Sequence, residues 1–128
     1  MRALRKLDIS FALYRCENGE KCLEYLSEQA ETWQKQDAMP VLILLDLNLP
    51  GTTGQEVLKK IKQNPRLRKI PVTVITTSAN PRDVEESYDN GANSYVLKPV
   101  AFDELLERLR TVMEFWTRAS VLPDSNPP

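Results

Sequence analysis

The chain has 128 residues, 41% of them hydrophobic and 27% charged, with a formal net charge of −1. A chain of this length predicts a single domain, which we place at residues 1–120, followed by a flexible Pro-rich tail at residues 121–128. The slightly acidic balance argues against general binding to nucleic acid or to acidic membranes, because both depend on an excess of basic residues.

Neither a membrane span nor an export signal is expected. The longest apolar run, Val41–Leu45, has five residues, far fewer than a bilayer requires. The first seven residues carry charges every few positions, unlike a secretory signal. Two cysteines do not make a disulfide framework in a domain of this size. We therefore expect a cytoplasmic protein with reduced thiols.

The sequence contains no histidine. This excludes Ser-His-Asp and Cys-His catalysis, as well as zinc bound by imidazole. Any chemistry must therefore use carboxylates, hydroxyls, lysine, backbone groups or a metal bound by oxygen.

Short apolar strands alternate with amphipathic helices along the chain. Residues 1–9 predict the end of a helix, and residues 11–15 predict a strand. A second helix separates that strand from the apolar strand 41–45. Thr53 and Glu56 have the spacing of a capping box and predict the start of the next helix.

The second half of the chain repeats this scheme. Residues 72–75 predict a strand, and Asn80-Pro81 fits a helix N-cap with proline in the first turn. Gly91 fits the end of that helix, before the strand 94–97. The last helix has the clearest apolar period, carried by Phe102, Leu105, Leu106, Leu109, Val112, Met113 and Trp116.

The order of these elements indicates the fold. Apolar strands of four to five residues, each separated from the next by a helix, predict right-handed crossovers and a parallel sheet. The predicted fold is therefore α/β, a doubly wound parallel sheet with helices on both faces. In such open sheets the ligand site lies beyond the carboxyl ends of the strands. Asp46, Asn48, Thr76 and Lys98 each follow a predicted strand directly or nearly so.

An acid, a hydroxyl and an ammonium group at one sheet edge form a coherent site for phosphoryl transfer. The Asp46 carboxylate attacks phosphorus and gives an acyl phosphate, an established covalent role of aspartate. Mg²⁺, ligated by Asp46 and the carbonyl of Asn48, neutralises one phosphoryl oxygen, and Lys98 pairs with a second. The Thr76 hydroxyl, with a backbone N–H near Thr77, takes the third. Taken singly, each side chain fits a turn cap or a solvated surface position; the three together favour the site.

Three stretches in register resemble the receiver domains of two-component signalling, which have the CheY-like fold. They are Leu44–Gly51 with Gly54, Pro71–Ser78 and Gly91–Pro99. Asp46 lies 30 positions before Thr76 and 52 before Lys98, spacings that also fit the family. The resemblance covers the chain from Met1 to about Trp116, and it implies a cis bond between Lys98 and Pro99.

The resemblance implies a role for each residue of the site. Asp46 would be the phosphoacceptor, the Asn48 carbonyl a metal ligand, and Lys98 the lysine that pairs with the phosphate. Charge added at Asp46 would draw in the Thr76 hydroxyl, and Tyr95 would pack into the space that it leaves. The phosphoryl donor would be a sensor histidine kinase. Enzyme activity would be at most Mg²⁺-dependent self-phosphorylation and dephosphorylation at aspartate.

Further stretches are similar to the small stand-alone receivers that serve cyanobacterial and bacterial phytochromes. They are Arg15–Gly19, Leu45–Gly51, Thr76–Asn80 and Phe115-Trp116 followed by Val121–Pro123. In that subgroup the residues past the last helix often assist dimerisation, so Phe115 and Trp116 are candidate contacts in a homodimer. Ordinary packing of the last helix on the sheet explains these two aromatic residues equally well. A phytochrome is the kind of kinase that this likeness implies.

The resemblance does not extend to the first strand of a receiver domain. A receiver begins with a central strand that ends in two adjacent acidic residues, which bind Mg²⁺ together with the phosphoacceptor. Here no paired acids precede Phe11, and Asp8 is a lone acid, so we expect four strands and weak Mg²⁺ binding. A misplaced start codon or a shortened chain explains this best. A degenerate receiver that re-pairs its strands or borrows one is the alternative.

Three other functions compete with the receiver. The chief rival is a pseudo-receiver that dimerises or docks without phosphorylation; the absent acids favour it, whereas the retained Asp46, Thr76 and Lys98 do not. A flavin or nucleotide enzyme on the same fold would need a phosphate-binding motif, and neither GxGxxG nor GK[ST] occurs. Nucleic-acid binding would rest on a basic cluster that better fits the solvated face of one helix. The cluster consists of Lys59, Lys60, Lys62, Arg66, Arg68 and Lys69.

Overall fold

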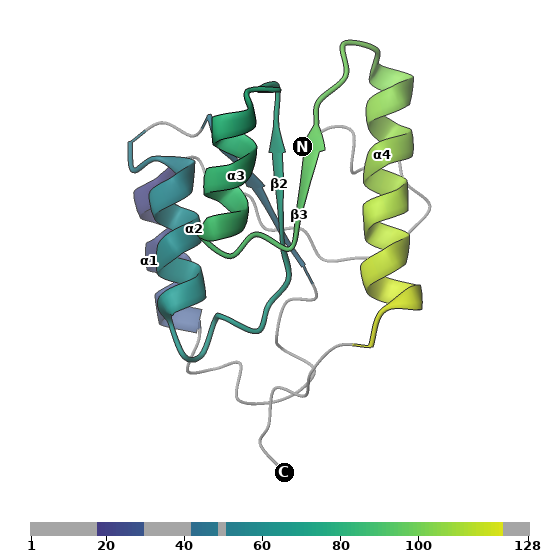
Figure 1. Cartoon of the computed structure of the whole chain (residues 1–128). Helices are drawn as coiled ribbons and strands as arrows, with labels where there is room; N and C mark the ends of the chain where they lie inside the picture. The colour runs from purple at the N-terminus through teal and green to yellow at the C-terminus, as the bar shows by residue number, and fades with distance from the viewer. Residues whose placement is uncertain (1–17, 30–41, 49–50, 122–128) are drawn as a thin grey trace.

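The computed structural model describes residues 18–29, 42–48 and 51–121 of the chain. The helix expected at residues 1–9 and the strand expected at residues 11–15 lie outside these ranges, as does most of the Pro-rich tail. The elements alternate along the described chain (Figure 1). They are α1 (Gly19–Gln29), β1 (Ile43–Asp46), α2 (Gly54–Gln63), β2 (Val72–Thr76), α3 (Pro81–Asp89), β3 (Ser94–Leu97), α4 (Phe102–Glu114) and the π-helical turn η4 (Phe115–Ala119).

The strands form a parallel sheet in the order β1-β2-β3. Ile43 pairs with Val72 at one end of β1, and Asp46 pairs with Ile75 at the other. The strand therefore continues one residue beyond the predicted apolar run, because the backbone of Asp46 still belongs to the ladder. The predicted parallel sheet is confirmed, and the fourth expected strand falls among the residues that are not described.

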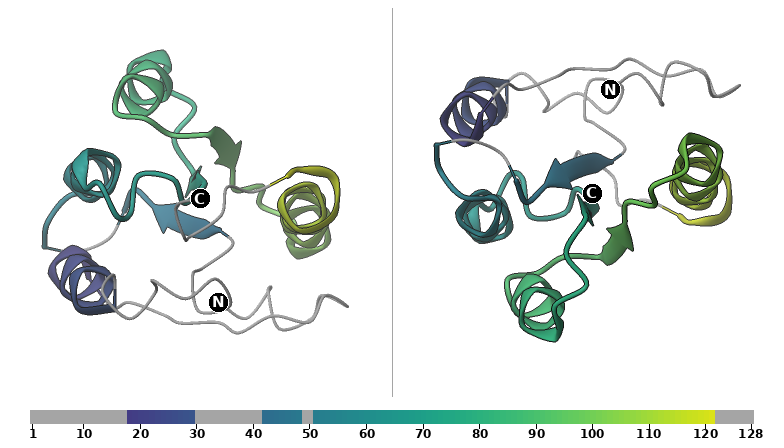
Figure 2. Two further views of the ribbon diagram at one scale, coloured as in Figure 1. Left: turned by 90° about the horizontal axis from the view of Figure 1, so that it is seen from below. Right: turned by 90° about the horizontal axis from the view of Figure 1, so that it is seen from above.

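Helices cover both faces of the sheet, as the doubly wound fold requires. Figure 2 shows α4 on one side and α2 and α3 on the other. The apolar residues of β1 alternate between the faces: Ile43 and Leu45 pack in a cluster with α1 and α2, whereas Leu44 packs in a second cluster with α4. The first cluster is centred on Cys22, Leu26, Leu45, Val57, Leu58, Ile61, Leu67, Ile70, Val72, Val74 and Ala92, and the second on Ile75, Leu109 and Met113.

Local side-chain chemistry sets the starts of two helices where the sequence predicts them. The Thr53 side chain accepts the N–H of Glu56 at 3.2 Å before α2. The Asn80 side chain accepts the N–H of Arg82 at 3.0 Å before α3, whose first residue is a proline. Each cap satisfies an N–H that has no partner within its helix. After α3, Gly91 adopts φ of 103°, a conformation that residues with a side chain rarely accept.

The predicted last helix changes its hydrogen-bonding pattern before its end. Leu109 and Met113 are buried against the sheet as the apolar period predicts. The α-helix ends at Glu114, and in η4 the N–H of Ser120 donates to the carbonyl of Phe115 at 2.7 Å. The predicted apolar period, which runs to Trp116, therefore extends past the end of the α-helix into this π-helical turn. None of the helices in the described residues is long and apolar enough to span a membrane.

Candidate functional site

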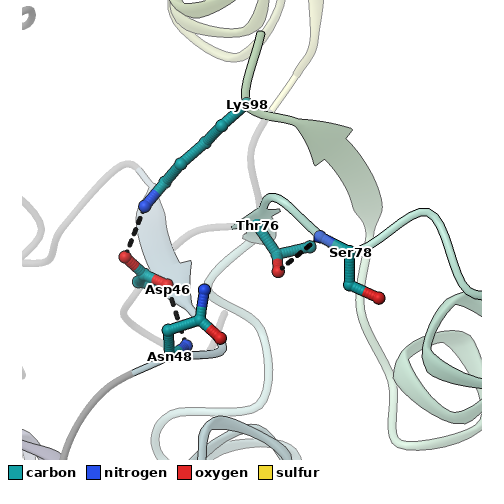
Figure 3. A network of polar contacts seen from close by, with 5 residues as sticks. All are labelled: Asp46, Asn48, Thr76, Ser78 and Lys98. Atoms are coloured by element: carbon teal, nitrogen blue, oxygen red, sulfur yellow. Dashed lines mark hydrogen bonds and ion pairs between the residues drawn. The ribbon is translucent and has the colours of Figure 1, made fainter. Parts of the chain in front are cut away.

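Asp46 and Lys98 meet at the carboxyl edge of the sheet (Figure 3). Asp46 is the last residue of β1, and Lys98 directly follows β3. Lys98 Nζ lies 2.5 Å from Asp46 Oδ2, and the two side chains are 23% and 31% exposed, respectively. The backbone N–H of Lys98 also donates to the carbonyl of Thr76 at 2.8 Å, which holds the lysine beside the end of β2. The ion pair is thus fixed by the sheet but open to solvent.

The other oxygen of Asp46 stabilises the turn that follows β1. The backbone N–H of Asn48 donates to Asp46 Oδ1 at 2.8 Å, an Asx-turn (Figure 3). Asp46 therefore has the turn-capping role that the sequence allows, in addition to its contact with Lys98. The Asn48 side chain is exposed, and in this structure it is the N–H of Asn48 that contacts Asp46.

Thr76 is a buried hydroxyl at the end of β2, the strand between β1 and β3. Its Oγ1 accepts the backbone N–H of Ser78 at 3.2 Å, which leaves the hydroxyl proton for another acceptor. Figure 3 shows Thr76 on the same edge as Asp46 and Lys98. Thr77 is exposed in the loop between β2 and α3. The predicted strand-end residues are therefore brought together at one edge.

Tyr95 of β3 is anchored to the loop that follows Thr76. Its Oη donates to the carbonyl of Ser78 at 2.8 Å, and its ring packs against the first apolar cluster. Burial raises the pKa of the Tyr95 phenol, and the Asp83 carboxylate raises it further, whereas the bond to Ser78 lowers it. Ser78 also donates its hydroxyl to Asp83 in the first turn of α3. Ser78 thus joins Thr76, Tyr95 and α3, a role that the sequence analysis missed.

The loop after Asp46 is packed tightly between α1 and α2. A Cβ on Gly54 would lie 2.6 Å from the Cα of Leu47, so only glycine allows α2 to start so close to the loop. Gly51 adopts φ of 79° in the same loop. From α1, the Glu20 carboxylate accepts the Thr52 hydroxyl at 2.5 Å, and this bond lowers the pKa of Glu20. The hydrogen bond between Glu20 and Thr52 joins residues 32 positions apart in the sequence, so no local sequence pattern predicts it.

The ligands predicted for a magnesium ion are the Asp46 carboxylate and the Asn48 carbonyl, and this pair stays a prediction. No group of three or more acidic, histidine or cysteine side chains in residues 18–29, 42–48 and 51–121 could hold a metal. Both oxygens of Asp46 already accept hydrogen bonds, from Lys98 and from Asn48. Mg²⁺ prefers octahedral coordination and retains water where protein ligands are few.

Two further predictions concern the Lys98–Pro99 bond after β3 and the aromatic residues Phe115 and Trp116 after α4. The Lys98–Pro99 bond is trans, since the described residues contain no cis peptide; the expected cis bond is wrong. Trans is the ordinary state of an X–Pro bond, favoured by about 0.5–1 kcal/mol. Phe115 and Trp116 make an edge-to-face contact with ring centroids 4.9 Å apart, and Phe115 is 50% exposed. Their role in a dimer stays a prediction.

Comparison with known proteins gives the family. The family profile of the response regulator receiver domain matches residues 2–110. Rcp1, a response regulator of Synechocystis sp., is 39% identical over 120 residues, which cover 94% of this chain and 80% of Rcp1. The probable methanogenesis regulatory protein FilR2 of Methanothrix harundinacea is 37% identical over 116 residues, which cover 91% of this chain and 73% of FilR2.

Solved structures agree with the sequence relatives. The phosphorylated cyanobacterial phytochrome response regulator RcpA has a TM-score of 0.83 and 36% identity, and the match covers 96% of this chain and 86% of RcpA. The Mn²⁺-bound form of Rcp1 has a TM-score of 0.79 and 38% identity, with 95% and 86% covered. The fold is CheY-like, and the chain belongs to the response regulator receiver domain family of two-component signalling.

Proposed function

We propose that this receiver accepts a phosphoryl group on Asp46 from a sensor histidine kinase. Phosphorylation then switches the conformation of a protein-binding surface. The observation that carries the proposal is the contact of Lys98 with Asp46 at the carboxyl edge of the sheet, beside the buried hydroxyl of Thr76. Partial exposure of the Asp46 carboxylate leaves it accessible to a phosphoryl donor.

The chemistry needs little beyond these groups. An Asp46 oxygen attacks the phosphorus of a phosphohistidine, the P–N bond breaks, and the imidazole leaves and takes up a proton. Lys98 then pairs with a phosphoryl oxygen, as a charged donor near the site of developing negative charge. The Thr76 hydroxyl and a backbone N–H near Thr77 stabilise another oxygen. Positioning and charge neutralisation are the main requirements of such a transfer.

Mg²⁺ is the proposed cofactor, held by the Asp46 carboxylate and the Asn48 carbonyl. When bound, it would neutralise negative charge on the phosphoryl group. Weak binding is expected because the described residues offer a single carboxylate there. The existence of a Mn²⁺-bound form of Rcp1, a relative with 38% identity, supports the binding of a divalent cation by this chain.

Thr76 and Tyr95 are the proposed switch. Movement of the Thr76 hydroxyl toward a phosphate on Asp46 would disturb its bond with the N–H of Ser78, whose carbonyl accepts Tyr95. The surface formed by α3, β3 and α4 would then change between two states. The contact of both switch residues with the same loop residue supports this proposal.

The proposed partners follow from the relatives. RcpA is a phytochrome response regulator of a cyanobacterium, which supports a phytochrome as the kinase that phosphorylates this chain. The half-exposed Phe115 supports a homodimer contact beside Trp116. We propose a cytoplasmic protein that contacts neither nucleic acid nor membrane, in line with the net charge of −1.

Phosphorylation by acetyl phosphate and Mg²⁺ tests this function. We expect the intact mass to rise by one phosphoryl group in the parent and in Asp89→Asn, a control at an exposed acid of α3. The increase should be absent in Asp46→Asn. A parent chain that takes up no phosphoryl group would instead favour the pseudo-receiver, a docking module without phosphorylation.

A further inference from the structure

The attachment of α3 to the rest of the protein is mainly polar. All nine residues of this helix are described, and Ser87 alone among them is buried. No residue of α3 belongs to either apolar cluster, whereas α2 contributes Val57, Leu58 and Ile61 to the first. Apolar burial is the chief force that holds most helices to a core. The position of α3 must therefore depend more strongly on its hydrogen bonds.

Gln55 makes two of these hydrogen bonds with one side chain. Its Nε2 donates to the hydroxyl of Ser87 at 2.9 Å, and its Oε1 accepts Asn90 Nδ2 at 3.0 Å. The Ser87 hydroxyl donates in turn to the carbonyl of Asp83 at 2.7 Å. Ser87 is fully buried, so water does not readily replace the amide of Gln55 there. One side chain of α2 thus holds the last turn of α3.

The place of Gln55 in the chain connects this contact to Asp46. Gln55 directly follows Gly54, which begins α2. A Cβ on Gly54 would lie 2.6 Å from the Cα of Leu47 and 3.1 Å from the carbonyl oxygen of Asp46. The first turn of α2 therefore lies against the backbone that leaves Asp46, and a shift of that backbone would reach Gln55 over one peptide unit.

We propose that Gln55 is a positioning residue that holds α3 against the loop following Asp46 and transmits movement of that loop to α3. The other end of α3 is held by the bond from the Ser78 hydroxyl to Asp83, and the N–H of Ser78 donates to Thr76. Both ends of α3 are thus tied to strand ends of the site. The coupling rests on the proposed phosphorylation of Asp46; the tether itself does not.

Hydrogen exchange of the α3 amides in the unphosphorylated chain tests the tether. Gln55→Met keeps the length of the side chain and removes both hydrogen bonds. We expect exchange of the α3 amides to accelerate roughly tenfold, the effect of two lost hydrogen bonds on local opening. Exchange of the Leu109 and Met113 amides in α4 should stay unchanged. Gln63→Met, the same substitution at an exposed position of α2, is the matched control.

A conservative variant separates the tether from a general loss of packing. Gln55→Glu keeps an acceptor for Asn90 and loses the donor to Ser87, so its α3 exchange should lie between those of the parent and Gln55→Met. Equal α3 exchange in the parent and Gln55→Met would overturn the tether. Accelerated exchange in α4 to the same extent as in α3 would also overturn it, because the effect would then be global.

Exchange after treatment with acetyl phosphate and Mg²⁺ tests the coupling. In the parent, phosphorylation should change the exchange of the α3 amides. In Gln55→Met the change should be smaller in the turn that contains Ser87 and Asn90, although the phosphoryl group is still taken up, because the link from Ser78 to Asp83 remains at the other end of α3. An equal response of both proteins would overturn the coupling. No phosphoryl uptake by the parent would overturn the proposed function and the coupling together, while the comparison without phosphate still decides the tether.

Discussion

At the scale of single residues, the partly exposed contact between Lys98 and Asp46 contributes little to stability, and we propose that it acts in phosphoryl transfer. Both side chains are partly exposed, and pairs of this kind contribute at most about 1 kcal/mol to folding. A lysine held 2.5 Å from a carboxylate is nevertheless well placed to stabilise charge that develops during phosphoryl transfer. Removal of Lys98 should therefore affect reactivity and stability very differently.

Lys98→Ala should slow the uptake of phosphoryl from acetyl phosphate by roughly a hundredfold, the usual effect of losing one charge-stabilising donor. Its free energy of unfolding should fall by less than about 1 kcal/mol. Phosphorylation followed by mass spectrometry, together with urea unfolding, measures both. Lys59→Ala, at an exposed position of α2, is the control and should leave the rate unchanged. Equal phosphorylation rates for Lys98→Ala and the parent would contradict the proposed role of Lys98 in phosphoryl transfer.

Tyr95 gives a prediction about pH. Its pKa is raised in the folded chain, chiefly by burial, so the folded state favours the neutral phenol. The stability linked to this group is fully present below the unfolded pKa of about 10 and is lost as pH rises through the folded pKa. Urea unfolding should therefore show a steeper loss of stability above about pH 10 in the parent than in Tyr95→Phe.

Tyr88→Phe is the matched control for this measurement, since Tyr88 is 49% exposed on α3. If Tyr95→Phe loses stability at high pH as steeply as the parent does, the environment inferred for the Tyr95 phenol is wrong.

At the scale of elements, sequence patterns predict those structural features that depend on residues close together in the chain. The caps at Thr53 and Asn80 depend on residues two or three positions away, so their spacing is enough to predict them. Asp46 and Lys98 could be placed at one edge because parallel strands end on the same side. The residue types predicted a phosphoryl-transfer site, and the motifs that resemble receivers predicted the phosphoacceptor role of Asp46 and the phosphate-pairing role of Lys98.

Contacts between distant segments escaped the sequence analysis for a physical reason. The bonds of Gln55 with Ser87 and Asn90 join residues 32 and 35 positions apart, and an amide side chain on a helix predicts no particular partner. The wide turn of η4 also leaves no clear pattern in the sequence. The dependence of α3 on polar contacts could be recognised only once the apolar clusters were known.

At the scale of the whole molecule, the described chain has a sheet with one apolar cluster on each face. The helices α1 and α2 pack in the larger cluster, and α4 packs in the smaller one. The turn η4, which continues α4, begins with Phe115, and this side chain is half exposed beside Trp116. An exposed aromatic side chain at the end of a helix fits an anchor in an interface between two copies.

Phe115→Ala should weaken self-association by about tenfold or more, as expected for loss of an aromatic anchor. Sedimentation across a range of protein concentrations measures the dissociation constant. Tyr88→Ala removes an aromatic ring of equal exposure from α3 and is the control. A chain that is monomeric throughout, or a dimer that weakens in Tyr88→Ala and not in Phe115→Ala, would contradict this contact.

Chemical mapping of the phosphorylated residue tests the proposal that Asp46 carries the phosphoryl group. Treating the phosphorylated chain with borohydride reduces an aspartyl phosphate to homoserine, which peptide mass spectrometry locates in the sequence. We predict homoserine at position 46, in the parent and not in Asp46→Asn. Homoserine at another aspartate, or its complete absence after confirmed exposure to acetyl phosphate and Mg²⁺, would contradict the assignment of Asp46.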